Sequence, residues 1–143
     1  MVILQDCREK RNKHDNVETY LKEQGYDIKR VKLNVGDYMF PHGKTSVDLK
    51  KDCSELANDL YRDKKALHKK YKKCLQYGIR LVVLIEEPIN GLESLRNWTS
   101  PYTRINGAYL ANLIHLAQVS YGIGFVFCSP QKTAQTLLKI LKE

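Results

Sequence analysis

Short apolar runs alternate along the chain with longer stretches in which apolar residues recur every three or four positions. The short runs predict strands, and the longer stretches predict helices with one buried face. The predicted strands cover residues 2–5, 26–33, a segment beginning near 35, 45–50, 80–86 and 124–128. The predicted helices cover residues 16–24, 54–74, 107–121 and 133–141. This alternation indicates an α/β domain in three layers, with helices flanking a mixed central sheet.

The second predicted helix departs from a simple amphipathic pattern. Ser54 is its expected N-cap. One apolar stripe follows the helix through Leu56, Leu60, Leu67, Tyr71 and Cys74. The stripe is interrupted at Asp63 and Lys64, so the helix either kinks there or turns polar groups toward a cleft.

A hairpin around residues 41–43 brings chemically active side chains together. Pro-His-Gly is turn chemistry, and the strand that follows it is 45–50. Because side chains two apart on a strand point the same way, Asp48 and Lys50 share one face. Asp37, at the start of the partner strand, lies within reach of Asp48.

Two carboxylates and one lysine have a defined chemical use. Carboxylate oxygens are ligands for hard divalent cations, and bound Mg²⁺ polarises a phosphodiester and lowers the pKa of a bound water. A neighbouring lysine can orient or deprotonate that water and offset charge on the phosphate. The same residues also fit a surface hairpin with cross-strand ion pairs, and spacing alone does not separate the two.

Bulk composition indicates one intracellular domain. The 143 residues carry a net charge of +8 and are 43% hydrophobic, which fits a globular chain. No apolar run predicts a membrane span or a signal peptide. Four scattered cysteines without a C-x-x-C pair suit a reducing compartment, so we expect the protein inside the cell, in the cytoplasm.

The positive charge is concentrated in one segment. Seven Lys and Arg side chains lie between Arg62 and Lys73, with Asp63 the one acid among them. Such a segment suits a polyanion partner, because lysines that contact phosphates release bound counterions, and this release favours binding. The candidate DNA-binding residues are Arg62, Lys64, Lys65, Lys69 and Lys70. A solvated helix face is the alternative.

Four motifs in order resemble one family. Gly36-Asp37-Tyr38 and Val47-Asp48-Leu49-Lys50 resemble the G-D…(E/D)-x-K core of the PD-(D/E)XK nucleases, and more narrowly the XPF/Hef-type structure-specific nuclease domain. Residues 6–10, 81–86 and 121–130 resemble its opening D-x-R-E, its apolar strand ending in Glu and its closing strand and helix. The chain looks like the small stand-alone forms of bacteria and phages.

The resemblance implies a restriction-endonuclease-like fold and a Mg²⁺- or Mn²⁺-dependent endodeoxyribonuclease. Its implied substrate is branched DNA (flaps, forks or junctions) in repair, recombination or phage DNA processing. Asp37 and Asp48 would be metal ligands, with the Leu49 carbonyl as a third and Asp6 as an outer or second-metal carboxylate. Lys50 would handle the attacking water and the phosphate charge.

Further site residues follow from the same motifs. Arg8 and Glu9 would support the site, and Glu55 best fits the family's later acid with one residue inserted. Asp6 also follows a predicted buried strand, where α/β ligand sites lie, although a turn-capping role is the alternative. Two positions depart from the pattern, since Asp48 replaces a Glu and Leu49 replaces an Arg.

The irregular segment 92–106 contains Trp98, Tyr102 and Arg104. An aromatic and basic loop can stack on an unpaired base or contact phosphate, while Trp98 also fits a core position.

Several alternatives stay open. We expect a single domain over residues 1–143 without a helix-hairpin-helix module, acting as a homodimer or with a partner that supplies DNA binding. The chain could instead be a catalytically inactive DNA-binding subunit, or a sequence-specific nuclease of the restriction kind.

Overall fold

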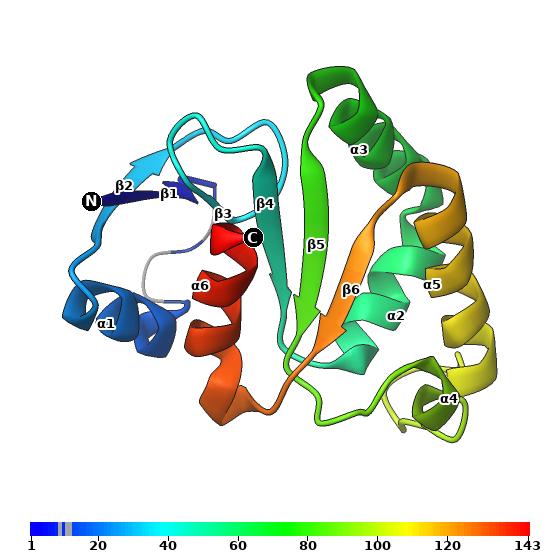
Figure 1. Cartoon of the computed structure of the whole chain (residues 1–143). Helices are drawn as coiled ribbons and strands as arrows, with labels where there is room; N and C mark the ends of the chain where they lie inside the picture. Colours follow the sequence, from blue (N-terminus) through cyan, green and yellow to red (C-terminus); the bar gives the residue numbers. More distant parts are fainter. Residues whose placement is uncertain (9, 11–12) are drawn as a thin grey trace.

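The computed structural model describes residues 1–8, 10 and 13–143, and these form a mixed sheet with helices on both faces (Figure 1). The strands are β1 (Val2–Asp6), β2 (Asp27–Val31), β3 (Tyr38–Met39), β4 (Thr45–Lys50), β5 (Arg80–Ile85) and β6 (Gly124–Phe127). The helices are α1 (Asp15–Glu23), α2 (Cys53–Arg62), α3 (Lys64–Tyr77), α4 (Leu92–Leu95), α5 (Gly107–Tyr121) and α6 (Thr133–Lys142), with a 3₁₀ turn at Pro130–Lys132.

The sheet order is β2-β1-β3-β4-β5-β6. β1 pairs with β2, β4 with β5 and β5 with β6 in parallel, whereas β3 is antiparallel to both β1 and β4. The short β3 therefore joins two parallel halves. The predicted α/β domain with a mixed central sheet is confirmed.

Each face of the sheet carries its own apolar core. Alternate residues of β4 divide between them: Val47 and Leu49 pack toward α1 and α6, and the opposite face of the sheet is covered by α2, α3 and α5 (Figure 1). Asp48 and Lys50 thus lie on the α2–α3 face, as the period of two requires.

The long basic helix is in fact two helices. α2 ends at Arg62 and α3 begins at Lys64, so the interruption of the apolar stripe marks a break. The predicted N-cap, Ser54, was wrong: the Asp52 carboxylate accepts from the Glu55 backbone N–H at 2.8 Å. Aspartate competes well for this position because its charge also favours the helix N-terminus.

In the described part of the chain, the helices are too short or too polar for any of them to cross a bilayer.

A glycine fixes the approach to Asp37. Gly36 has φ +82°, and the Ser46 hydroxyl beneath it donates to the Val35 carbonyl at 2.7 Å. A Cβ at Gly36 would lie 2.0 Å from the Ser46 oxygen and 3.3 Å from the Val47 carbonyl. Only glycine combines this backbone conformation with so close an approach to β4.

We predict that Gly36→Ala lowers the free energy of unfolding by about 3 kcal/mol, because a strained φ and a steric overlap add together. Gly25→Ala is the matched control, since Gly25 also has positive φ but nothing within 4 Å of its added Cβ. Strain alone should cost that variant about 1 kcal/mol. Urea unfolding measures both, and equal losses would contradict the steric role of Gly36.

Candidate active site

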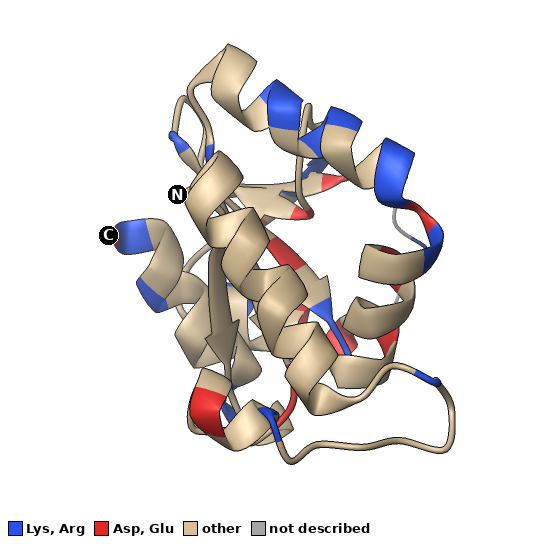
Figure 2. Cartoon of the chain, turned by 90° about the vertical axis from the view of Figure 1, so that its right-hand side faces the viewer, with Lys and Arg blue, Asp and Glu red and all other residues tan. Residues whose placement is uncertain are grey.

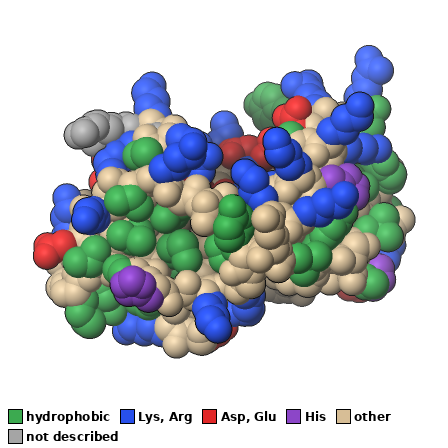
Figure 3. Space-filling model, turned by 90° about the horizontal axis from the view of Figure 1, so that it is seen from above, with side chains coloured by type: hydrophobic (Ala, Val, Ile, Leu, Met, Phe, Trp, Pro, Cys, Tyr) green, Lys and Arg blue, Asp and Glu red, His purple; other side chains and the backbone are tan. Residues whose placement is uncertain are grey.

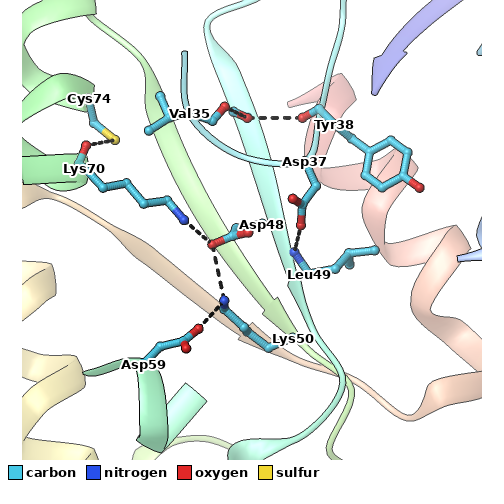
Figure 4. A network of polar contacts seen from close by, with 10 residues as sticks. Val35, Asp37, Tyr38, Asp48, Leu49, Lys50, Asp59, Lys70 and Cys74 are labelled. Atoms are coloured by element: carbon cyan, nitrogen blue, oxygen red, sulfur yellow. Dashed lines mark hydrogen bonds and ion pairs between the residues drawn. The ribbon is translucent and has the colours of Figure 1, made fainter. Parts of the chain in front are cut away.

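Hydrogen bonds with two strands, β1 and β4, hold Asp37. Its N–H donates to the Val47 carbonyl, and its carbonyl accepts from the Asp6 N–H, both at 2.8 Å. Its carboxylate accepts from the Leu49 N–H at 2.8 Å (Figure 4). Asp37 is only 5% exposed. The peptide groups of β1 and β4 therefore orient a buried carboxylate toward the end of β4.

Asp48 lies beside it and is 6% exposed. The Lys70 ammonium, which comes from α3, donates to Asp48 Oδ2 at 2.6 Å, and the Lys50 ammonium lies 3.9 Å from the same oxygen (Figure 4). Burial alone would raise the pKa of Asp48. The charges of Lys70 and Lys50 and a hydrogen bond with Asp37 outweigh burial and lower the pKa below its usual value.

Lys50 connects the strand to α2. Its ammonium donates to Asp59 and also approaches Asp48. Burial would lower the pKa of Lys50, but Asp48 and Asp59 raise it well above the ordinary lysine value. Lys50 is therefore a cation at neutral pH and is suited to donating hydrogen bonds and offsetting negative charge.

Asp6 and Arg8 make a separate clamp. Both oxygens of Asp6 accept from Arg8 Nε, at 3.1 and 2.9 Å, and one also accepts from the Leu33 N–H at 3.0 Å. Arg8 donates in addition to the Leu33 carbonyl. The clamp fixes the start of the loop that leads to Asp37. Glu9, the other predicted support, lies outside the described residues.

Glu55 lies apart from the Asp48 network. Its carboxylate accepts from the Lys51 N–H at 3.3 Å, and its side chain lines a cavity of about 630 Å³ that Leu49 and Glu86 also line. Asp59, one helical turn further along α2, contacts Lys50 instead. Sequence reasoning did not single out Asp59, although its i+4 spacing from Glu55 would have placed both on one helix face.

A basic wall flanks these acids. The exposed Arg62, Lys64, Lys65 and Lys69 and the half-buried Lys70 follow one another along the end of α2 and α3, and the blue segments of the ribbon in Figure 2 mark the lysines of α3. Figure 3 shows acidic side chains at the bottom of a cleft with basic ones on both sides. Among the five predicted DNA-binding residues, Lys70 is the one that contacts Asp48.

The donors present fit a hard divalent cation. Asp37 and Asp48 bring two buried carboxylates into contact, and a bound cation would have to displace the Lys70 ammonium from Asp48 Oδ2. Among the described residues, no group of three or more His, Cys, Asp and Glu side chains is placed to hold a metal. Two carboxylates completed by water and substrate phosphate are the usual arrangement for Mg²⁺.

Fold and site together define an ERCC4 domain, and the chain belongs to that family, whose model matches residues 5–141. Two solved structures share its fold: XPF from Aeropyrum pernix, at 18% identity and a TM-score of 0.72, and XPF from Aeropyrum pernix in a complex with DNA, at 19% and 0.73. Each match covers 99% of this chain but only 64% and 63% of the respective solved chain. Among curated proteins, none matches significantly. The resemblance to the XPF/Hef-type domain is thus confirmed.

We predict that Lys70→Met lowers the free energy of unfolding at neutral pH and makes that free energy depend less on pH in the acid range. Because Asp48 has a lowered pKa in the fold, its contribution to stability is complete above the unfolded value of about 3.9 and is lost as pH falls through the folded value. Removing Lys70 raises the folded pKa toward the unfolded value, so Asp48 contributes less stability at neutral pH and less of it remains to be lost in acid.

Urea unfolding from pH 2.5 to 7, in EDTA, measures this shift. Lys69→Met is the matched control, because Lys69 is the exposed neighbour of Lys70 on α3. Superimposable pH profiles for the two variants would show that Lys70 does not govern the ionisation of Asp48.

Proposed function

We propose that this chain is a metal-dependent DNA endonuclease that hydrolyses phosphodiester bonds in branched DNA such as flaps, forks or junctions. The observation that carries the proposal is the meeting of Asp37, Asp48 and Lys50 at the base of a cleft with basic sides. Membership of the ERCC4 domain family and the fold shared with XPF support it.

DNA as substrate has two supports. One of the solved XPF structures contains DNA. In this chain, α3 carries six lysines and no acid, a composition that favours a phosphate backbone. A role in repair or recombination, a preference for branched DNA and a homodimeric assembly follow from the family resemblance and belong to the same proposal.

Asp37 and Asp48 would hold Mg²⁺ or Mn²⁺, with the Leu49 carbonyl as a further oxygen. The bound ion supplies an acidified water and polarises the phosphate. Lys50, as an ammonium, donates to the attacked phosphate and offsets its growing negative charge. Asp59 orients Lys50 from α2, while Asp6 and Arg8 hold the loop on which Asp37 lies.

Leu49 occupies the position at which the family motif has an arginine, and it lies in the apolar core. Its side chain is 3% exposed and belongs to the core on the α1–α6 face. A guanidinium at that position would be buried among Val47 and Leu84. The positive charge near Asp48 comes instead from Lys70, which reaches it from α3.

We predict that Asp48→Asn lowers the rate of cleavage at least about 100-fold, because it removes a metal ligand and half of the charge that binds the ion. The assay compares linear duplex, splayed fork, 3′ flap, 5′ flap and four-way junction, each with Mg²⁺, Mn²⁺ or EDTA. Asp63→Asn is the matched control, since Asp63 is exposed at the break between α2 and α3.

The outcomes separate three functions. Cutting of branched forms that needs metal and is lost in Asp48→Asn supports the proposal. Binding without cutting under every metal would leave a catalytically inactive DNA-binding subunit. Cutting of plain duplex at one fixed sequence would identify a nuclease of the restriction kind.

We also predict that the double variant Lys65→Ala and Lys69→Ala weakens DNA binding and makes it less sensitive to salt. Each lost phosphate contact lowers the slope of log K against log salt by about 0.9, so the slope should fall by about 2. Lys139→Ala with Lys142→Ala is the control, since both lysines lie on α6, across the sheet from α3. An unchanged slope in the α3 variant would exclude that helix from the DNA contact.

A further inference from the structure

A second surface feature lies at the end of α2, beyond the contact of Asp59 with Lys50. A pocket of about 700 Å³ opens between the end of α2 and the loop that enters α5. We call it the tyrosine pocket, after the five side chains that matter here: Tyr61, Tyr102 and Tyr109, with Arg62 and Arg104. The catalytic network makes no use of these residues.

Its three tyrosines are unusually open to solvent. Tyr61 is 55% exposed, Tyr102 is 81% and Tyr109 is 41%. They come from α2, from the loop before α5 and from the first turn of α5, so no periodic pattern of one helix explains their meeting. Several large exposed rings around one pocket mark a binding surface, because folding itself gains little from them.

The charge around these rings is positive. Arg62 and Arg104 line the pocket, and none of the described Asp and Glu residues lines it. The Lys64 ammonium also lies 5.5 Å from the centre of the Tyr61 ring. A ligand for this surface therefore needs flat rings that stack and negative charges at short intervals.

Unpaired nucleotides satisfy both conditions. We infer that the tyrosine pocket binds a single-stranded segment of DNA, with bases stacked on the tyrosines and phosphates held by the two arginines. Every base has a face that stacks, so such a site accepts any sequence. The inference rests on the proposed function in one respect, since it names the unpaired part of the same DNA as the ligand.

The position of the pocket suits a strand that also passes through the cleft. α2 presents Asp59 to Lys50 and presents Tyr61 and Arg62 to the pocket. Because these residues lie within one turn of α2, the two sites are at most about one helix diameter apart, about 10 Å. At about 3.4 Å per nucleotide, about three nucleotides bridge that distance. The pocket would then select DNA in which pairing ends a few nucleotides from the scissile bond.

An acidic segment of a protein is the competing ligand. It would pair with Arg62 and Arg104 but would leave the three rings without stacked partners. A Tyr→Phe exchange keeps the ring that stacks and removes only the hydroxyl. Binding that survives Tyr→Phe but not Tyr→Ala therefore depends on stacking, as a nucleic acid requires.

The experiment measures binding of fluorescein-labelled dT15 and of a blunt 20-base-pair duplex by anisotropy, in EDTA so that nothing is cut. Tyr102→Ala and Arg104→Ala should each weaken dT15 binding about tenfold and duplex binding less than about twofold. Tyr102→Phe should bind dT15 as the unmodified chain does. Tyr77→Ala is the matched control, since Tyr77 is 51% exposed on α3 and does not line the pocket.

Three results would overturn the inference: dT15 binding that Tyr102→Ala leaves unchanged, equal losses in Tyr77→Ala, or displacement of dT15 by poly-glutamate as effectively as by unlabelled dT15. The nuclease proposal is judged separately, by cleavage with metal. If the protein cuts DNA but Tyr102→Ala still binds dT15 normally, only the pocket inference is refuted. If dT15 binding depends on the tyrosines but no DNA is cut, only the nuclease proposal is refuted.

Discussion

The burial of two neighbouring carboxylates at the end of β4 is the constraint on which the site depends. Two like charges 4 Å apart repel by about 4 kcal/mol in a protein-like medium, and burial adds a desolvation cost. Asp37 is stabilised by the Leu49 N–H, and Asp48 by ammonium groups from two elements. The arrangement persists because the compensating groups come from structures that are themselves packed.

This requirement explains why α2 and α3 are separate helices. α2 must place Asp59 against Lys50, and α3 must place Lys70 against Asp48. Both helices also bury Leu60, Tyr71 and Cys74 in one core. The break at Asp63 lets each helix make its own contact. Lys70 then belongs both to the basic wall and to the acids below it.

The sequence predicted those parts of the site that depend on local geometry. The period of two in β4 placed Asp48 and Lys50 on one face, and turn chemistry placed residues 41–43 between the strands. Those contacts that depend on packing were not predicted. Whether Lys70 faces phosphate or Asp48 depends on the angle of α3 to the sheet, and the partnership of Asp59 with Lys50 depends on where α2 begins. The N-cap of α2 was itself predicted two residues too late, at Ser54 instead of Asp52.

The two halves of the sheet contribute different parts of the site. β1, the Asp6–Arg8 clamp and Gly36 fix the path of the chain to Asp37, whereas β4, α2 and α3 supply the remaining charges. Short, antiparallel β3 joins them, and the Asp6 N–H and Val47 carbonyl both bond to the Asp37 backbone. The relative position of the two carboxylates is therefore set by backbone hydrogen bonds and not by flexible side chains. A site built in this way can change its ligand or its charge partners while its two central oxygen donors stay in place.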